Sequence, residues 1–174
     1  EYIYGPDIVR DYTEPLFLDR LQQSLAAINP ALPAVAIQEA IDKIRQIDTG
    51  SLVQRNEVFT DYLQNGVDVS YFDGEEQHSA CVRLIDYDHP LHNNFVVANQ
   101  WSIEEHSVRR ADIIVFINGL PLVVMELKSP SRTETNVSEA YAQLRNYMQE
   151  IPSLFVYNAF CVMSDLVTSK AGTI

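Results

Sequence analysis

The 174-residue sequence has only two cysteines and no hydrophobic run long enough to cross a membrane. A membrane-spanning helix needs about 20 consecutive apolar residues, and the chain does not open with the basic head and apolar core of a signal peptide. Cys81 and Cys161 lie in apolar, strand-like segments without metal-ligand spacing, which predicts two buried, reduced thiols. These features favour a cytoplasmic protein and argue against a membrane-bound or secreted one.

Basic residues are also scarce, because 12 Lys and Arg stand against 24 Asp and Glu and give a net charge of −12. Unaided binding of a phosphate backbone needs clustered Lys and Arg, so any nucleic acid must be held by something else. The sequence lacks a GxxxxGK[ST] motif, and therefore has no recognisable nucleotide-binding loop of its own. Because it begins without methionine and runs out directly after a predicted strand, we interpret it as a piece of a longer protein.

What the chain does have is 47% hydrophobic residues, enough to form one compact core, so we expect a single domain. Apolar residues at helical spacing predict three helices. These span residues 13–29 with Thr13 as N-cap, about 34–47, and 51–65 before Gly66. The first 50 residues should therefore be helical.

From Val67 the pattern changes to that of strands, with candidates in VDVSYF, SACVRLIDY and FVVANQWSI. Farther on, Asn136 is a candidate cap for a helix that ends near Glu150, and LFVYNAFCVMSD is a largely apolar strand. This order predicts an α/β sandwich around a mixed sheet. His89 and His92, in a polar loop, are interpreted as surface residues and not as metal ligands.

The segment ADIIVFINGLPLVVMELK predicts a β-hairpin, because Asn118-Gly119 separates two apolar runs. A two-residue turn would pair Asp112 with Met125 and leave Glu126 on the other face of the sheet. An odd-length loop or one bulge would align the two acids. Pro121 cannot donate to the ladder and favours a wider loop, residues 117–121, which sets Asp112 opposite Glu126.

Two adjacent carboxylates at the rim of a sheet repel each other, and a hard cation such as Mg²⁺ resolves the repulsion with oxygen ligands. Lys128 projects from the same face as Glu126, two positions along the strand. The three residues are suited to activating water and stabilising charge on an attacked phosphate, that is, to phosphodiester hydrolysis. A plainer interpretation is that Glu126 and Lys128 only mark the solvated end of a buried strand.

Gln143 and Tyr147 stand at i and i+4 on the following predicted helix and so share one face. A hairpin with Asp112 and Glu-x-Lys, followed by a helix with this pair, is a much rarer combination than Glu-x-Lys alone. The motifs ADIIVFINGLPLVVMELKSP, AYAQLRNYMQEIPSLFVYNAFCVMSD, RLIDYDHPLHNNFVVANQW and NEVFTDYLQNGVDVSY resemble the N-terminal nuclease domain of the R subunit (HsdR) of type I restriction enzymes. That family belongs to the PD-(D/E)xK nuclease superfamily, and the resemblance covers most of residues 16–168.

The resemblance implies a Mg²⁺-dependent endonuclease domain with a PD-(D/E)xK core in residues 51–174, a mixed sheet flanked by helices. In the intact prokaryotic R subunit an ATP-driven DNA translocase follows, and modification and specificity subunits assemble with it on double-stranded DNA. ATP would bind only in those motor domains.

Residue roles are also implied by the family motifs. Asp112 and Glu126 match the metal-binding acids, Lys128 the catalytic lysine, and Gln143 and Tyr147 the pair that supports DNA placement or the active site. Ala111 stands where the family usually has proline, a minor departure because proline there mainly stiffens the backbone. The superfamily often adds an acid from an early helix; Glu57 and Asp61 are candidates, although solvated helix residues are the better interpretation of both.

Two alternatives stay open at this point. The same residues would serve the nuclease domain of another helicase-linked defence or repair protein, which trims DNA ends. A catalytically silent nuclease-like fold that acts as a docking module is disfavoured by the presence of all three chemical residues.

Overall fold

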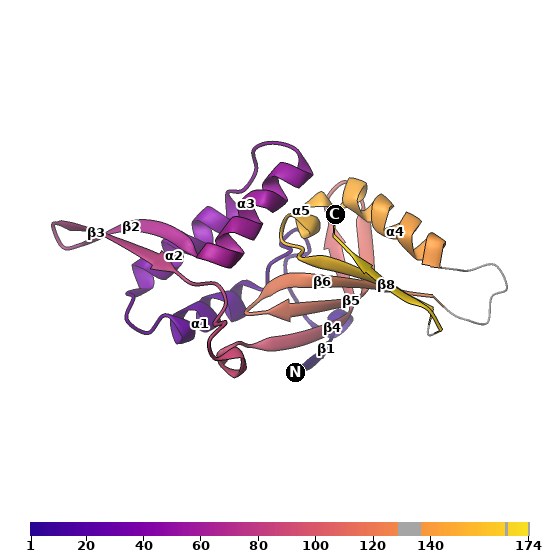
Figure 1. Cartoon of the computed structure of the whole chain (residues 1–174), viewed down its shortest axis with the longest axis horizontal. Helices are drawn as coiled ribbons and strands as arrows, with labels where there is room; N and C mark the ends of the chain where they lie inside the picture. Colours follow the sequence, from indigo (N-terminus) through magenta and orange to yellow (C-terminus); the bar gives the residue numbers. More distant parts are fainter. Residues whose placement is uncertain (129–136, 166, 174) are drawn as a thin grey trace.

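A computed structural model describes residues 1–128, 137–165 and 167–173 of the chain (Figure 1). The elements are, in order, β1 (Tyr2–Tyr4), η1 (Gly5–Asp7), α1 (Leu18–Ile28), α2 (Ala34–Arg45), α3 (Leu52–Asn65), β2 (Val67–Asp73), β3 (Glu76–Val82), η2 (Pro90–His92), β4 (Phe95–Glu104), β5 (Val108–Ile117), β6 (Leu120–Leu127), α4 (Val137–Glu150), α5 (Pro152–Val156), β7 (Phe160–Ser164) and β8 (Ser169–Gly172). Among the described residues, no helix has the length and apolar character that a membrane span requires.

The main sheet has six strands in the order β1-β4-β5-β6-β7-β8. The pairs β1/β4 and β6/β7 are parallel and the others are antiparallel. This confirms the predicted α/β class with a mixed sheet. Strands β2 and β3 form a separate two-stranded sheet, so the expectation that all strands from Val67 onward build one sheet is wrong for this hairpin.

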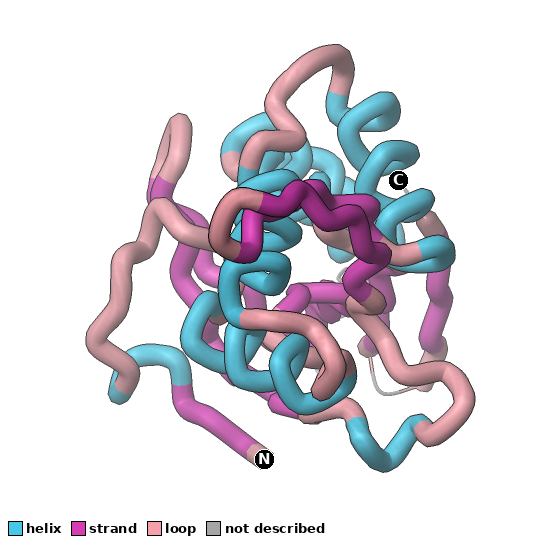
Figure 2. The backbone as a smooth tube through the Cα atoms, turned by 90° about the vertical axis from the view of Figure 1, so that its left-hand side faces the viewer, coloured by secondary structure: helices cyan, strands magenta, loops and turns pink. Residues whose placement is uncertain are grey.

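Two hydrophobic cores hold the elements together. In the first, α1, α2 and α3 pack with the β2–β3 hairpin around side chains such as Leu25, Ile41 and Phe59. Seen from that end, the hairpin lies against these helices (Figure 2). In the second, α4 and α5 cover the sheet around Trp101 and Phe116. The periodicity of each helix buries one stripe, but it carries no information about which strands that stripe meets.

The two cores are joined by close backbone contacts. The Phe17 N–H donates to the Gly119 carbonyl at 2.9 Å, and a Cβ added to Gly119 would lie 2.5 Å from the Leu21 nitrogen. Glycine at 119 therefore lets α1 approach the β5–β6 turn. Within the first core, the rings of Phe59 and Tyr157 meet edge to face with centroids 5.3 Å apart.

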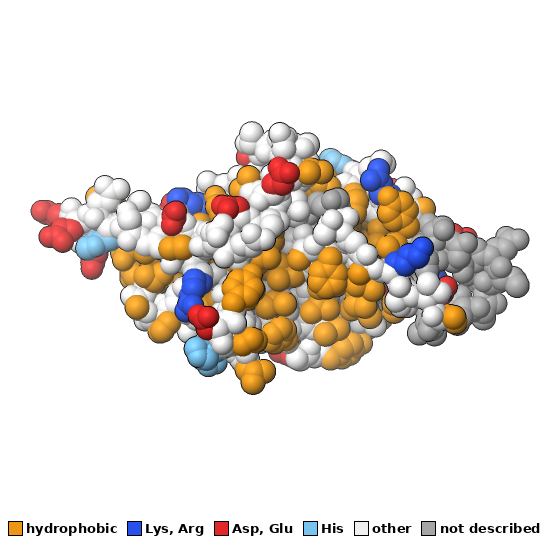
Figure 3. All heavy atoms as spheres, viewed as in Figure 1, with side chains coloured by type: hydrophobic (Ala, Val, Ile, Leu, Met, Phe, Trp, Pro, Cys, Tyr) orange, Lys and Arg blue, Asp and Glu red, His pale blue; other side chains and the backbone are white. Residues whose placement is uncertain are grey.

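The opposite face of the six-stranded sheet is apolar and open. The register places Tyr2, Val97, Val115, Val123 and Phe160 in one row across five strands, and all of these side chains are exposed or half-buried. Apolar side chains gather over these strands in the space-filling view (Figure 3).

The predicted helices are present, with corrected ends. The third is confirmed, with Ser51 and Gln54 forming a capping box and Gly66 as C-cap at φ 85°. The second ends at Arg45. The first begins at Leu18 and not at Thr13, because the Thr13 N–H and hydroxyl both donate to the Asp11 carboxylate in a local turn.

The strand predictions need three corrections. The edge strands β1 and β8 were not anticipated, and Pro152 opens the short helix α5, so the last predicted strand is confined to Phe160–Ser164.

Cys161 is buried as predicted, and burial raises its pKa to about 12, but Cys81 is exposed; both are free thiols. The proposed helix cap Asn136 lies outside the described residues.

Candidate active site

The β5–β6 hairpin aligns the two predicted acids through a bulge. Its turn has two residues, Asn118 at φ 53° and Gly119 at φ 82°, with Ile117 paired to Leu120. The left-handed conformation of both residues is that of a tight hairpin turn. The wider loop predicted from Pro121 is therefore wrong.

The register shifts farther along the hairpin. Phe116 pairs with Pro121 but Val115 pairs with Val123, so Leu122 is an extra residue in β6. Ile113 then pairs with Met125, and continuing this register by one residue places Asp112 opposite Glu126. The missing N–H of proline is accommodated beside a bulge, where ladder bonds are interrupted in any case.

Asp112 is held from both neighbouring strands. Its Oδ2 accepts the Leu127 N–H of β6 at 2.9 Å, and its Oδ1 accepts the Gln100 side-chain amide of β4 at 3.2 Å. Gln100 lies across from Asp112, between the pairs Asn99–Ile113 and Trp101–Ala111. Its φ of 56° is a strained conformation for a non-glycine residue inside a strand, and such strain concentrates at functional sites.

Sequence reasoning missed Gln100, since nothing in FVVANQWSI indicates a left-handed residue. One signal exists in retrospect: the apolar alternation of β4 shifts by one position, with Val96 and Ala98 buried before Gln100, then Trp101 and Ile103 after it. A shift of this kind indicates a bulge or kink in a strand.

Glu126 is the buried acid of the pair, with 2% of its surface exposed. Its Oε1 lies 3.1 Å from the Lys128 ammonium, whereas its Oε2 is buried without a hydrogen-bond donor among the described residues. Burial, and then the negative charge of Asp112, raise the pKa of Glu126 to about 7 against the opposing effect of Lys128. An acid held at this pKa is able to gain or lose a proton near neutral pH.

A chain of hydrogen bonds links Lys128 to α4 and β5. The Lys128 ammonium donates to the side-chain oxygen of Gln143, the Gln143 amide donates to the Tyr147 hydroxyl at 2.6 Å, and that hydroxyl donates to the Arg110 carbonyl at 3.2 Å. Tyr147 is buried, and burial is the main cause of its raised pKa. The structure thus brings together all five residues predicted for the site.

A polar depression opens beside these residues. It is lined by Gln100, Ser102, Val108, Arg109, Arg110, Asp112, Gln143 and Tyr147. Arg109 forms an ion pair with Glu150 at its margin. Asp112 is therefore reached from solvent through this depression, and Arg109 and Arg110 place positive charge in its wall.

The other sequence candidates lie elsewhere. Glu57 and Asp61 are exposed on α3, and neither lines the depression. His89 and His92 are exposed as predicted, but they join Asp86 in a group of potential metal ligands whose atoms lie within 4.8 Å of one another.

Comparison with known proteins gives a family match over nearly the whole chain. Residues 2–173 match the family described as the type I restriction enzyme R protein N terminus. The chain is 37% identical over 184 residues to the type I restriction enzyme HindI endonuclease subunit of Haemophilus influenzae, covering 100% of this chain and 17% of that protein.

Two further relatives carry similar names. The putative type I restriction enzyme MjaIXP endonuclease subunit of Methanocaldococcus jannaschii is 30% identical over 182 residues, covering 99% of this chain and 17% of that protein. The type I restriction enzyme SauCOLORF180P endonuclease subunit of Staphylococcus aureus is 38% identical over 79 residues, covering 45% of this chain and 8% of that protein. The chain therefore spans only a small part of the length of these relatives.

Proposed function

The chain belongs to the family of type I restriction enzyme R protein N termini, and on this basis we propose that it is the DNA-cleaving domain of such a subunit. The observation that carries the proposal is the bulged hairpin, which places Asp112 opposite the buried Glu126 with Lys128 beside it. An acid pair and a lysine at the ends of two central strands of a mixed sheet, beside an open polar depression, support a PD-(D/E)xK core and phosphodiester hydrolysis.

The acid pair fits a divalent cation. Glu126 Oε2 is buried and receives no hydrogen bond from the part of the chain that the structure describes, and the negative charges of Asp112 and Glu126 repel each other. Oxygen ligands of this kind suit Mg²⁺, so Asp112 and Glu126 would hold the ion. When bound, Mg²⁺ would activate water and offset negative charge on the phosphate.

The chain's own residues orient the reactants. Gln143 fixes the ammonium of Lys128 by accepting a hydrogen bond from it, and Tyr147 fixes Gln143 by accepting a hydrogen bond from its amide. Lys128 is thereby positioned to orient an attacking water and to stabilise the charge that develops on the phosphate. Gln100 and the Leu127 N–H hold the two oxygens of Asp112.

We also propose the wider setting. Residues 1–174 would form one endonuclease domain, with residues 1–50 as a mainly helical N-terminal part that also adds β1 to the sheet, and residues 51–174 as the nuclease core; the contact between Phe17 and Gly119 supports a single domain. An ATP-driven motor outside this chain would deliver double-stranded DNA, and modification and specificity subunits would complete a cytoplasmic prokaryotic complex. Because other parts hold the DNA, a cleaving domain with a net charge of −12 is acceptable.

Plasmid cleavage by the reconstituted enzyme tests the proposal. Asp112→Asn and Lys128→Ala should each abolish cleavage while ATP hydrolysis continues, because the motor is a separate part. Matched control variants are Asp19→Asn and Lys170→Ala, both at exposed positions, and these should cut normally. Normal cutting by Asp112→Asn or Lys128→Ala would refute the assigned site.

Titration of the metal-free chain with Mn²⁺, a spectroscopic substitute for Mg²⁺, separates cleavage from docking. Asp112→Asn and Glu126→Gln should each weaken Mn²⁺ binding by at least about tenfold, whereas Asp19→Asn should not. A chain that binds no Mn²⁺ at these acids would instead favour the docking module.

A further inference from the structure

The loop between β3 and β4 gathers three ligand-type side chains at the other end of the β5–β6 hairpin from Asp112. Asp86 and His89 precede η2, with His89 as its N-cap, and His92 is the last residue of its single turn. We propose that Asp86, His89 and His92 form a binding site for a borderline transition-metal ion such as Zn²⁺. This site is separate from the proposed nuclease site and does not depend on it.

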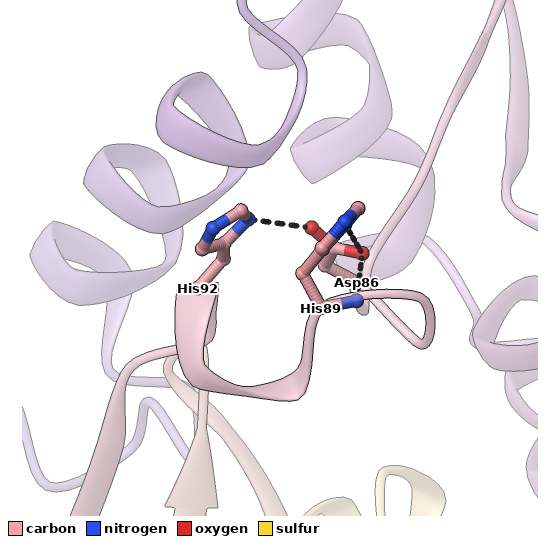
Figure 4. A group of neighbouring side chains, drawn as sticks. All are labelled: Asp86, His89 and His92. Carbon is pink, nitrogen blue, oxygen red and sulfur yellow. Dashed lines mark hydrogen bonds and ion pairs between the residues drawn. The ribbon is translucent and has the colours of Figure 1, made fainter.

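Both imidazoles converge on one carboxylate (Figure 4). The Nδ1 atom of His92 lies 3.0 Å from Asp86 Oδ2, and the Nδ1 atom of His89 lies 3.7 Å from Asp86 Oδ1. The two rings stack with centroids 4.9 Å apart and planes 19° apart. One ligand atom from each of the three residues lies within 4.8 Å of the others, which is close enough for all three to share one ion.

The burial of the three side chains suits an ion that enters from solvent. The Asp86 side chain is 6% exposed, whereas those of His89 and His92 are 68% and 63% exposed. The buried acid is fixed, because its Oδ1 accepts the His89 backbone N–H at 3.0 Å. The exposed rings are free to adjust by a few tenths of an ångström around an incoming ion.

The loop is already organised for binding. Asn93 accepts the Asp86 N–H at 2.9 Å and donates to the Asp86 carbonyl at 2.9 Å. Asn118 of the hairpin turn donates to Asn93 and to the Leu84 carbonyl, each at 2.8 Å. Binding would therefore require little ordering of backbone, which lowers its entropic cost.

Ligand spacing and chemistry select the class of ion. Zn–N and Zn–O bonds of about 2.1 Å in a tetrahedral site place ligand atoms about 3.4 Å apart. The ligand atoms of these three residues lie within 4.8 Å of one another, so small movements of the exposed rings would bring them to that spacing. Imidazole nitrogen favours Zn²⁺, Co²⁺, Ni²⁺ or Cu²⁺ over Mg²⁺. Three protein ligands leave an outward position for water or a fourth ligand.

Calorimetric titration with Zn²⁺ tests the site on the untagged chain, with millimolar Mg²⁺ present to occupy the acid pair. A Cys81→Ser background removes the exposed thiol as a competing ligand. We expect one Zn²⁺ per chain at this site. Affinity should fall at least about tenfold in His89→Gln and in His92→Gln, and binding should vanish in the double variant.

Two controls make the result specific. His78→Gln replaces an exposed histidine on the β2–β3 hairpin and should leave Zn²⁺ binding unchanged. Asp112→Asn should also leave it unchanged, so failure of the zinc site and failure of the nuclease site are distinguishable. Equal Zn²⁺ affinity in the double histidine variant and its parent, or no binding by the parent, would overturn the proposal.

X-ray absorption of the Zn²⁺-loaded chain provides a second measurement. We expect two imidazole nitrogens and one carboxylate oxygen at about 2.0–2.2 Å. A first shell that contains sulfur, or oxygen alone, would overturn the assignment even if the stoichiometry were correct.

Discussion

The backbone N–H of Leu127 donates to the carboxylate of Asp112 across the β5–β6 hairpin, at 2.9 Å. This bond ties the acid of one strand to the residue that follows Glu126 on the next. Leu127 and Glu126 are adjacent, so Asp112 is held where its charge acts on Glu126 and helps to raise the pKa of that buried acid. The protonation state of Glu126 therefore depends on this arrangement and can be used to test it.

Without divalent ions, the chain should lose stability as the pH rises towards neutrality. Glu126 has a pKa of about 7 in the folded chain against an ordinary 4.5. Its contribution is fully present below the lower value and is lost as the pH rises through the higher one. Glu126→Gln should therefore gain stability relative to the parent between about pH 5 and about pH 8, by up to about 3 kcal/mol. Urea unfolding at both pH values measures this, and the exposed Glu139→Gln should show no such gain.

Divalent-ion binding should release a proton near pH 6. At that pH Glu126 is mostly protonated in the metal-free chain, and a carboxylate must be ionised to bind a cation. Calorimetry with Mn²⁺ in two buffers of different ionisation enthalpy measures the release, which should approach one proton near pH 6 and vanish near pH 8. A release that persists in Glu126→Gln would assign the proton to another group.

Gln100 should matter for cleavage and also carry backbone strain. Gln100→Ala and Gln100→Gly both remove the hydrogen bond to Asp112, so both should reduce plasmid cleavage in the reconstituted enzyme. Alanine keeps the strain of a left-handed φ and glycine relieves it, so Gln100→Gly should be more stable than Gln100→Ala by about 1 kcal/mol. Equal stability of the two variants would show that φ at this position is not strained.

Gly119 should tolerate substitution poorly because of packing as well as conformation. A Cβ there would lie 2.5 Å from the Leu21 nitrogen and 2.6 Å from the Phe17 carbonyl oxygen, so Gly119→Ala should cost about 3 kcal/mol. Gly74 also has a positive φ, of 66°, but no atom of the described residues lies within 4 Å of its added Cβ. Gly74→Ala should cost only about 1 kcal/mol, and thermal unfolding of both variants gives the difference due to packing.

Sequence reasoning reached the class of fold and the grouping of Asp112, Glu126 and Lys128, because alternation along strands and a strong turn signal are local properties. It wrongly favoured a longer loop over a bulge, since both accommodate Pro121 and no local pattern separates them. Strands β1 and β8 have three and four residues, too few for a periodic pattern. Asp86 lacks any local sign of its position, because its contact with two histidines depends on a loop held by Asn93 and Asn118.

The extra residue Leu122 has a consequence at the level of the gene. Loss of its codon would leave an unbroken ladder that still pairs Asp112 with Glu126, because Pro121 would then be followed directly by Val123. Gain of one more codon beside it would instead move Glu126 and Lys128 together to the open apolar side of the sheet. Natural variation in this strand should therefore tolerate a missing residue at the bulge better than an added one.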